Sequence, residues 1–183
     1  MSTFQYYVAS TIDGFIASPE DDLGWLLQFD GNDEVNDGIG QFMAGVGCIA
    51  MGGDTYRWLM EHEPGKWPYP EIPCWVFTHH EYSAPAESDI TYVRGDVREF
   101  APDLARAAKD KNVWLVGGGD LVAQFAEAGL LDEMILTIVP VVLGAGKPLL
   151  PLKGPTPPLE LVSSRTLGGA AVELRYRLQQ SAG

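Results

Sequence analysis

An apolar strand runs into three glycines and then a helix at Val113-Trp114-Leu115-Val116-Gly117-Gly118-Gly119-Asp120-Leu121. Glycine lets a backbone approach a phosphate closely, and the free N–H groups at a helix N-terminus can hold an anion. A Rossmann fingerprint would require another glycine at Val122 and an acidic residue about 20 positions on. The stretch therefore predicts a strand-to-helix junction that is either a phosphate site or a structural turn.

Two further strand ends carry groups that suit an anion. Met51 is followed by Gly52-Gly53-Asp54-Thr55-Tyr56, where Thr55 can cap a helix and also offer its hydroxyl to a phosphate. The stretch Trp75-Val76-Phe77 ends in Thr78, His79 and His80, one hydroxyl and two imidazoles that could meet a phosphate. Solvated loop histidines are the alternative interpretation of that third junction.

Along the whole chain, hydrophobic periodicity predicts eight strands and four helices. The strands are Phe4–Ser10, Val46–Met51, Pro73–Thr78, Ile90–Val93, Val113–Val116, Met134–Val142, Leu159–Thr166 and Ala171–Leu178, and the helices are Asp33–Met43, Thr55–Glu61, Ala101–Lys109 (with Pro102 in its first turn) and Asp120–Ala128. The last strand alternates apolar and polar residues and follows Gly168-Gly169, which predicts an antiparallel hairpin. We expect a three-layer α/β fold with a mixed, mostly parallel central sheet flanked by helices.

Composition limits the classes of function. The 183 residues suit one domain, spanning 1–183, and the net charge of -13 disfavours nucleic acid as a partner. No apolar run reaches the roughly 18 residues of a membrane span, and no signal-peptide pattern begins the chain, so we expect a cytoplasmic protein. Cys48 and Cys74 are expected to be buried thiols, and the three histidines match no standard metal-ligand spacing, so we expect no metal.

Five motifs in one order carry a resemblance to a known family. They are Ala9-Ser10-Thr11-Ile12-Asp13-Gly14-Phe15-Ile16-Ala17, Met51-Gly52-Gly53-Asp54-Thr55-Tyr56, Val116-Gly117-Gly118-Gly119-Asp120-Leu121, Leu131-Asp132-Glu133 and Pro140-Val141-Val142-Leu143-Gly144-Ala145-Gly146-Lys147-Pro148-Leu149. On these motifs the chain resembles the dihydrofolate-reductase-like family, in the branch that holds the reductase domain of bifunctional riboflavin-biosynthesis enzymes.

The resemblance implies an NADPH-dependent reductase that transfers hydride to a small heterocyclic substrate of pyrimidine or pterin type, such as 5-amino-6-(5-phosphoribosylamino)uracil or dihydrofolate. By position, the implied cofactor-binding residues are Ala9 and Ile16 at the nicotinamide, Gly53, Asp54 and Thr55 along the phosphates, Thr78 and His79 at the adenosine 2′-phosphate, and Gly118, Gly119, Asp120, Leu121 and Val122 around the pyrophosphate. The loop Asp13–Trp25 would close over the site and bring Asp13 and Trp25 to the substrate, and Asp37 is the nearest candidate for a catalytic carboxyl.

The chain also departs from the family pattern. Gly53-Asp54 stands where many relatives carry a basic residue against the phosphates, and Val116 stands where riboflavin-type reductases carry a substrate-holding Glu. Arg57, His79 or His80 could supply the missing cation. These departures motivate an alternative hypothesis, a non-catalytic nucleotide-binding module that retains the fold. Because relatives pair through the sheet and its C-terminal strands, we also expect a homodimer that uses Val172 to Leu178.

Overall fold

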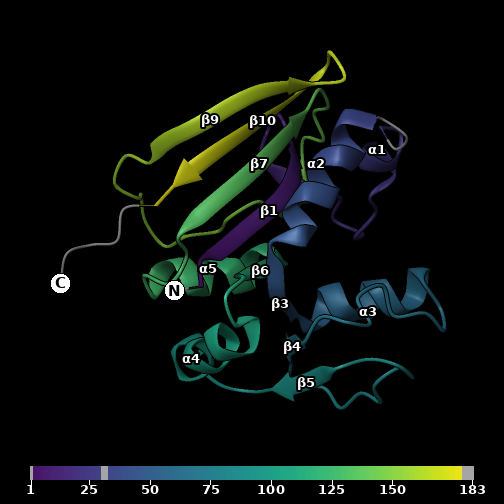
Figure 1. The fold of residues 1–183 in the computed structure, drawn as a ribbon. Helices are drawn as coiled ribbons and strands as arrows, with labels where there is room; N and C mark the ends of the chain where they lie inside the picture. The colour runs from purple at the N-terminus through teal and green to yellow at the C-terminus, as the bar shows by residue number, and fades with distance from the viewer. Residues whose placement is uncertain (1, 30–32, 179–183) are drawn as a thin grey trace.

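A twisted eight-stranded sheet forms the centre of the computed structural model, which describes residues 2–29 and 33–178 (Figure 1). Its strands are β1 (Phe4–Thr11), β3 (Val46–Gly52), β4 (Cys74–Phe77), β5 (Ile90–Val93), β6 (Asn112–Gly117), β7 (Glu133–Val139), β9 (Glu160–Leu167) and β10 (Ala171–Arg177). Their order is β5-β4-β3-β6-β1-β7-β10-β9, parallel from β5 to β7, with β10 antiparallel to both of its neighbours. The expected mixed, mostly parallel sheet with a C-terminal hairpin is confirmed.

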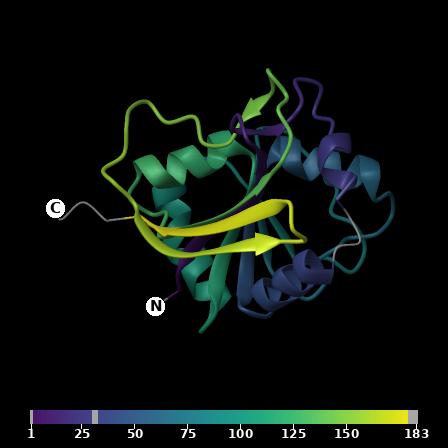
Figure 2. The same cartoon turned by 90° about the horizontal axis from the view of Figure 1, so that it is seen from above.

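Helices cover both faces of this sheet, which makes the three layers. In Figure 2, α4 (Val97–Ala108) and α5 (Gly119–Glu127) lie on one side, and α2 (Asp33–Ala44) and α3 (Gly53–His62) lie on the other. The alternation of β3 explains this, because Cys48 and Ala50 pack with α4 and α5 whereas Ile49 and Met51 pack beneath α3. Among the described residues, no helix combines the length and the apolar character needed to cross a bilayer.

Two expected boundaries were wrong by three residues or more. Helix α4 begins at Val97 rather than Ala101, because the Asp96 carboxylate accepts a hydrogen bond of 2.8 Å from the backbone N–H of Arg98 and caps the helix there. Pro102 therefore lies inside the helix and not in its first turn. Strand β7 ends at Val139 rather than Val142, since Pro140 follows and cannot donate to the ladder.

Three short elements were not expected from the sequence: β2 (Phe15–Ala17), β8 (Lys147–Pro148) and the single-turn helix α1 (Gly24–Leu27). Strands β2 and β8 pair with each other in a separate antiparallel sheet. Each element is too short to show a hydrophobic period. They nevertheless build one wall of the site described below.

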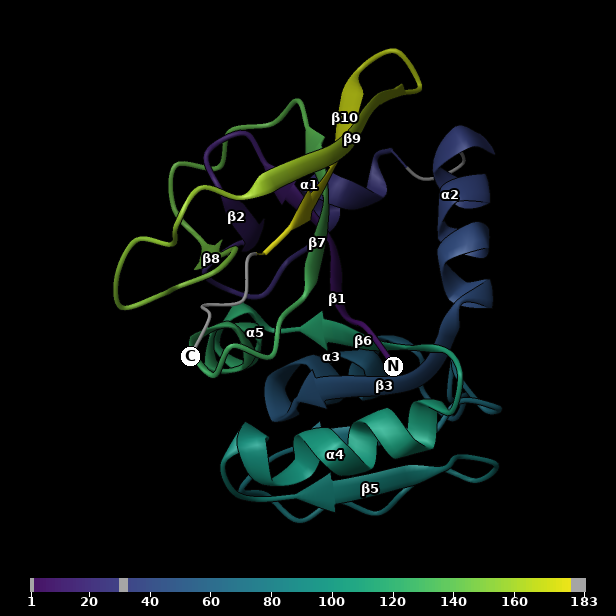
Figure 3. The same ribbon diagram turned by 60° about the vertical axis from the view of Figure 1, so that its left-hand side comes forward.

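The C-terminal hairpin turns at Gly168 and Gly169, whose φ angles of 55° and 74° suit glycine. Alternation along β10 is present, but its polar row is not simply solvated: Glu173 is only 9% exposed and pairs with Arg165 of β9 at 2.7 Å. Strand β9 lies at the edge of the sheet, far from β5 at the opposite edge, and the twist between them is clear in Figure 3.

The sheet opens in its middle. Strands β1 and β6 pair only from Phe4↔Val113 to Tyr6↔Leu115, whereas β1 continues to pair with β7 as far as Thr11↔Val139. On its other side β6 stays paired with β3 up to Met51↔Gly117, at the last residue of β6. Beyond Tyr6, β1 and β6 therefore separate at their carboxyl ends, which is where parallel α/β sheets bind ligands.

Candidate functional site

A cleft of about 310 Å³ occupies the gap between the carboxyl ends of β1 and β6. Strand β1 contributes Val8 and Ala9 to its floor, and β6 contributes Val116 and Gly117. The first turns of α3 and α5 form the sides, and β2, β8 and α1 close the remaining wall. The separation of two paired strands, rather than a surface loop, thus creates the cavity.

The glycines of the β6–α5 junction lie directly at the cleft. A Cβ at Gly117 or Gly118 would lie 3.9 Å from the Thr55 hydroxyl, so that hydroxyl faces the glycine backbone across the gap. At Gly119 there is no room for a side chain, since a Cβ would lie 2.5 Å from the carbonyl oxygen of Pro148 and 2.9 Å from that of Leu149. The start of α5 is therefore held against the segment that follows β8.

A similar close approach explains the unusual Gly53. A Cβ at this position would lie 2.8 Å from the Thr78 hydroxyl, so the start of α3 packs on the end of β4 without space for a basic side chain. The neighbouring Asp54 carboxylate pairs with Arg57 at 2.9 Å and its side chain is 81% exposed. Arg57 therefore offsets the negative charge of this carboxylate in the cleft lining.

A second, smaller pocket of about 210 Å³ lies on the other side of Gly52. Thr78, His79 and Arg94 line it, and Arg94 donates a hydrogen bond of 2.6 Å to the backbone carbonyl of His79. Asp120 lines both this pocket and the cleft, so the two cavities adjoin at the first turn of α5. A guanidinium and a hydroxyl beside helix N-termini form a suitable environment for a phosphate.

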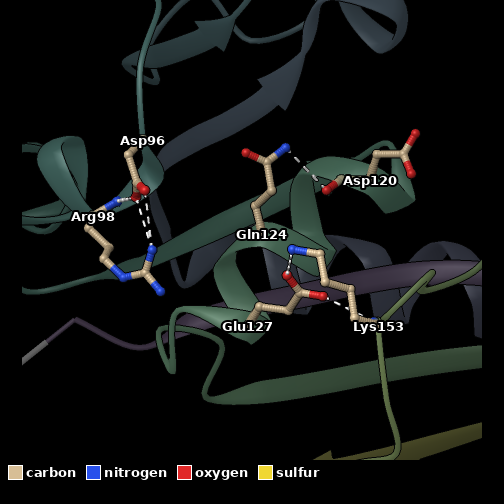
Figure 4. Close-up of polar contacts among 6 residues, drawn as sticks. All are labelled: Asp96, Arg98, Asp120, Gln124, Glu127 and Lys153. Carbon is tan, nitrogen blue, oxygen red and sulfur yellow. Dashed lines mark hydrogen bonds and ion pairs between the residues drawn. The ribbon is translucent and has the colours of Figure 1, made fainter.

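Figure 4 shows how α5 presents its polar side chains. The backbone carbonyl of Asp120 accepts a hydrogen bond of 3.4 Å from Gln124, while the Asp120 carboxylate points away from the other residues drawn. One turn further on, Glu127 pairs with Lys153 at 3.0 Å, which lowers the pKa of this carboxyl through hydrogen bonds from Lys153. The Glu127–Lys153 pair thus lies at the far end of the helix, outside the cleft lining.

Asp13 joins the two loops that carry β2 and β8. Its carboxylate accepts hydrogen bonds from the Thr11 hydroxyl at 2.6 Å, from the N–H of Gly144 at 2.7 Å and from the N–H of Leu143 at 3.2 Å. Gly146 then packs its backbone against the carbonyl of Ala17. Asp13 consequently positions the wall of the cleft and does not line it.

These contacts predict an acid-sensitive wall. The Thr11 hydroxyl first, and then the two N–H groups, hold the pKa of Asp13 below its usual value of 3.8, so the ionised carboxylate stabilises the junction above that pH and the effect is lost as pH falls through the lowered pKa. We expect Asp13→Asn to speed amide hydrogen exchange at Leu143 and Gly144 at neutral pH. Equal protection of both amides in the variant and the parent would refute this role.

Several of the candidate residues meet in the cleft. Its lining includes Ala9, Ile16, Asp54, Thr55, Gly118, Gly119 and Asp120, and the second pocket includes Thr78, His79 and Leu121. Gly53 and Val122 lie outside both linings, where they pack α3 and α5 against the sheet. The geometry thus brings the three predicted strand-end junctions into one continuous region.

Other candidates do not reach the cleft. Trp25 is 7% exposed and packs with Val139 and Leu167, although its neighbours Leu23 and Leu26 do line the cavity. Asp37 is exposed on α2 and lines neither pocket, so proton delivery by Asp37 has no geometric support. Among the residues described, no group of three His, Cys, Asp or Glu side chains could hold a metal ion.

Sequence reasoning missed Trp58, Leu59, Lys147 and Arg94. Trp58 and Leu59 follow Thr55 by three and four residues, so helical spacing alone could have placed them on the same face. Arg94 directly follows β5, one of the parallel strands whose carboxyl ends meet at this edge. Lys147 carried no such signal, because its position depends on the pairing of β2 with β8.

Known proteins share this architecture. The family model of the RibD C-terminal domain matches residues 66–172. The uncharacterized protein YwjB of Bacillus subtilis (strain 168) is 34% identical over 170 residues, which cover 93% of this chain and 94% of that protein.

Two solved structures extend the likeness to three dimensions. A putative riboflavin biosynthesis protein from Shewanella sp. PV-4 superposes with a TM-score of 0.83 at 23% identity, covering 97% of this chain and 99% of that one. Dihydrofolate reductase from Enterococcus faecalis, complexed with NADP(H), gives a TM-score of 0.64 at 16% identity, with 97% and 96% covered. At these identities the two structures establish a shared fold.

Proposed function

Because the chain belongs to the RibD C-terminal domain family, whose fold is that of known reductases, we propose that it is an NADPH-dependent oxidoreductase acting on a small heterocyclic substrate. The observation that supports this most is the convergence of two glycine-bearing junctions on one cleft. Thr55 at the start of α3 faces the backbone of Gly117 and Gly118 across the gap. A pyrophosphate held between two helix N-termini would gain backbone N–H donors from both.

The adjoining pocket supports NADPH as the proposed nucleotide. Thr78 and Arg94 offer a hydroxyl and a guanidinium at a distance from the cleft, joined to it through Asp120. Nicotinamide dinucleotides with and without a 2′-phosphate differ at the adenosine end, so a cation there would discriminate between them. Arg94 would thus supply the cation that many relatives carry after the position of Gly52.

When bound, NADPH supplies a hydride. This chain's own residues then have to hold the reacting groups face to face and exclude water, which accounts for the apolar Val8, Ile16 and Val116 on the cleft surface. The carboxylates of the described lining, Asp21, Asp54 and Asp120, are not buried. We therefore assign proton delivery to water rather than to a buried carboxyl.

A nucleotide-binding module without turnover is the second candidate. Two features motivate it. The guanidinium of Arg57 is already paired with Asp54, and the apolar Val116 offers no polar group to a substrate. Both candidates require the same cleft and differ only in chemistry. Turnover is therefore the property that separates them.

The proposal is tested by following NADPH oxidation with pyrimidine, pterin and flavin-related acceptors. We expect at least one acceptor to be reduced at a rate proportional to enzyme concentration. Ile16→Arg, which places a charge on the apolar surface, is expected to lower that rate, whereas Ile12→Arg, on an exposed residue outside the cleft, should leave it unchanged. Tight NADPH binding with no oxidation in the presence of any acceptor would instead establish the module.

A further inference from the structure

We infer that the substrate is an uncharged, flat heteroaromatic molecule without a phosphate or carboxylate group. This inference rests on the proposed function, since it concerns the part of the cleft that a bound nucleotide would leave open. The glycine junction and the second pocket form the anion-suited end of the site. The opposite end is lined by Ile16, Leu23, Leu26, Trp58 and Leu59.

The distribution of positive charge is the first step. All twelve Lys and Arg side chains belong to the described residues, and Lys147 is the one that lines the cleft. Its ammonium group already faces the Asp21 carboxylate at 3.7 Å. Arg57 lies beside the lining residue Asp54 and is likewise paired with the Asp54 carboxylate. A phosphorylated substrate would find no unpaired cation in the cleft.

Negative charge also makes the apolar end of the cleft unfavourable for a substrate anion. Asp21, which lines the cleft beside Leu23, is the carboxylate of this end, and the whole chain carries a net charge of -13. A phosphate dianion or a carboxylate on the substrate would be repelled by this field unless a dedicated cation compensated it. Uncharged N–H groups of a heterocycle, in contrast, would find an acceptor in the Asp21 carboxylate.

The shape of the apolar end favours a flat ring. The indole of Trp58 stacks on the imidazole of His62 with ring centroids 4.0 Å apart and an interplanar angle of 17°. The His62 ring is itself tied to the Trp58 carbonyl by a 2.8 Å hydrogen bond. This stacking fixes the plane of the indole, while Leu23 and Leu26 of the α1 segment supply apolar surface to the same cavity. A fixed aromatic wall with leucine side chains suits a planar, weakly polar molecule.

The test compares two ligands that differ by one phosphate, and it includes a third, uncharged ligand. Calorimetric titrations of the protein saturated with NADP⁺ would use 5-amino-6-(5-phosphoribosylamino)uracil, its dephosphorylated counterpart, and the uncharged bicyclic pteridine lumazine. We expect the phosphate to improve affinity by less than about threefold, because a half-exposed, already paired lysine contributes little. A phosphate that improves affinity by more than about tenfold would overturn the inference. Failure of both uncharged ligands to bind the NADP⁺-loaded protein would overturn it as well.

A matched pair of variants makes the test sharper. Leu26→Arg adds a cation to the cleft lining and should raise the relative affinity of the phosphorylated ligand by about tenfold, whereas Leu27→Arg, on an exposed neighbour outside the lining, should change it by less than about twofold. An equal response of the two variants would contradict the assigned cleft surface. If NADP⁺ itself does not bind the parent protein, the proposed function fails, an outcome distinct from a wrong substrate class.

Discussion

Replacing Gly119 with alanine is expected to weaken NADPH binding by at least about tenfold and to lower the free energy of unfolding by about 1–3 kcal/mol. The added Cβ would lie 2.5 Å from the carbonyl oxygen of Pro148 and 2.9 Å from that of Leu149, both of them backbone atoms that a rotamer change cannot move. The first turn of α5 must then shift away from β8, and its backbone N–H groups would no longer point into the cleft. Urea unfolding and a nucleotide titration measure the two effects.

Gly40→Ala is the matched control for this prediction. Gly40 lies on the exposed surface of α2, and nothing lies within 4 Å of its added Cβ. Alanine in a helix has less backbone freedom to lose on folding, so this variant should be more stable by about 0.5–1 kcal/mol, with NADPH affinity unchanged. A Gly119→Ala protein with the stability and affinity of the parent would refute the tight contact between α5 and β8.

Arg94→Gln is expected to weaken NADPH binding by about tenfold to a hundredfold, the range for a lost hydrogen bond to a charged group, while NADH affinity changes by less than about twofold. The guanidinium lines the second pocket beside Thr78, where the proposed 2′-phosphate would lie. NADH lacks that phosphate, so its binding does not depend on a contact with the Arg94 guanidinium. The ratio of the two dissociation constants, measured for both nucleotides, is therefore the informative quantity.

Arg106→Gln provides the control for net charge. Arg106 pairs with Asp103 on α4 and lines neither pocket. Its substitution therefore removes one positive charge at a site away from the proposed nucleotide. A general electrostatic effect would lower NADPH affinity equally in both variants. Loss in the Arg94 variant alone would identify a local contact, and unchanged selectivity after Arg94→Gln would remove this residue from the nucleotide site.

Local sequence signals predicted the junctions well. Gly118, Gly119 and Asp120 follow an apolar strand, and Thr55 follows another, so each was expected at a strand-to-helix turn whatever the rest of the chain did. The pairing of β10 with β9 was equally local, because Gly168 and Gly169 determine the turn. Such features depend on neighbours along the chain and are visible in a single sequence.

The long-range strand pairing and contacts that form the cleft could not be predicted from local sequence. The cleft exists because β1 leaves β6 after Tyr6 while keeping its register with β7, and no periodicity in Phe4–Thr11 reports that choice of partner. The side chain of Lys147 reaches the cleft through the two-residue strand β8, and Asp13 acts across 131 residues on Gly144. Expected roles for Asp13 and Trp25 in substrate contact had rested on the family resemblance, whereas burial and hydrogen bonds direct both side chains elsewhere.

We propose that the cleft between β1 and β6 and the second pocket together form one NADPH site. Its most direct test is a fluorescence titration of the parent protein with NADPH and, in parallel, with NADH, since Trp58 lies in the cleft lining. We expect saturable quenching by both nucleotides with NADPH binding at least about tenfold more tightly, as a charge-assisted contact to the 2′-phosphate requires. Absence of saturable binding by either nucleotide would contradict this NADPH site and leave the two junctions as structural turns.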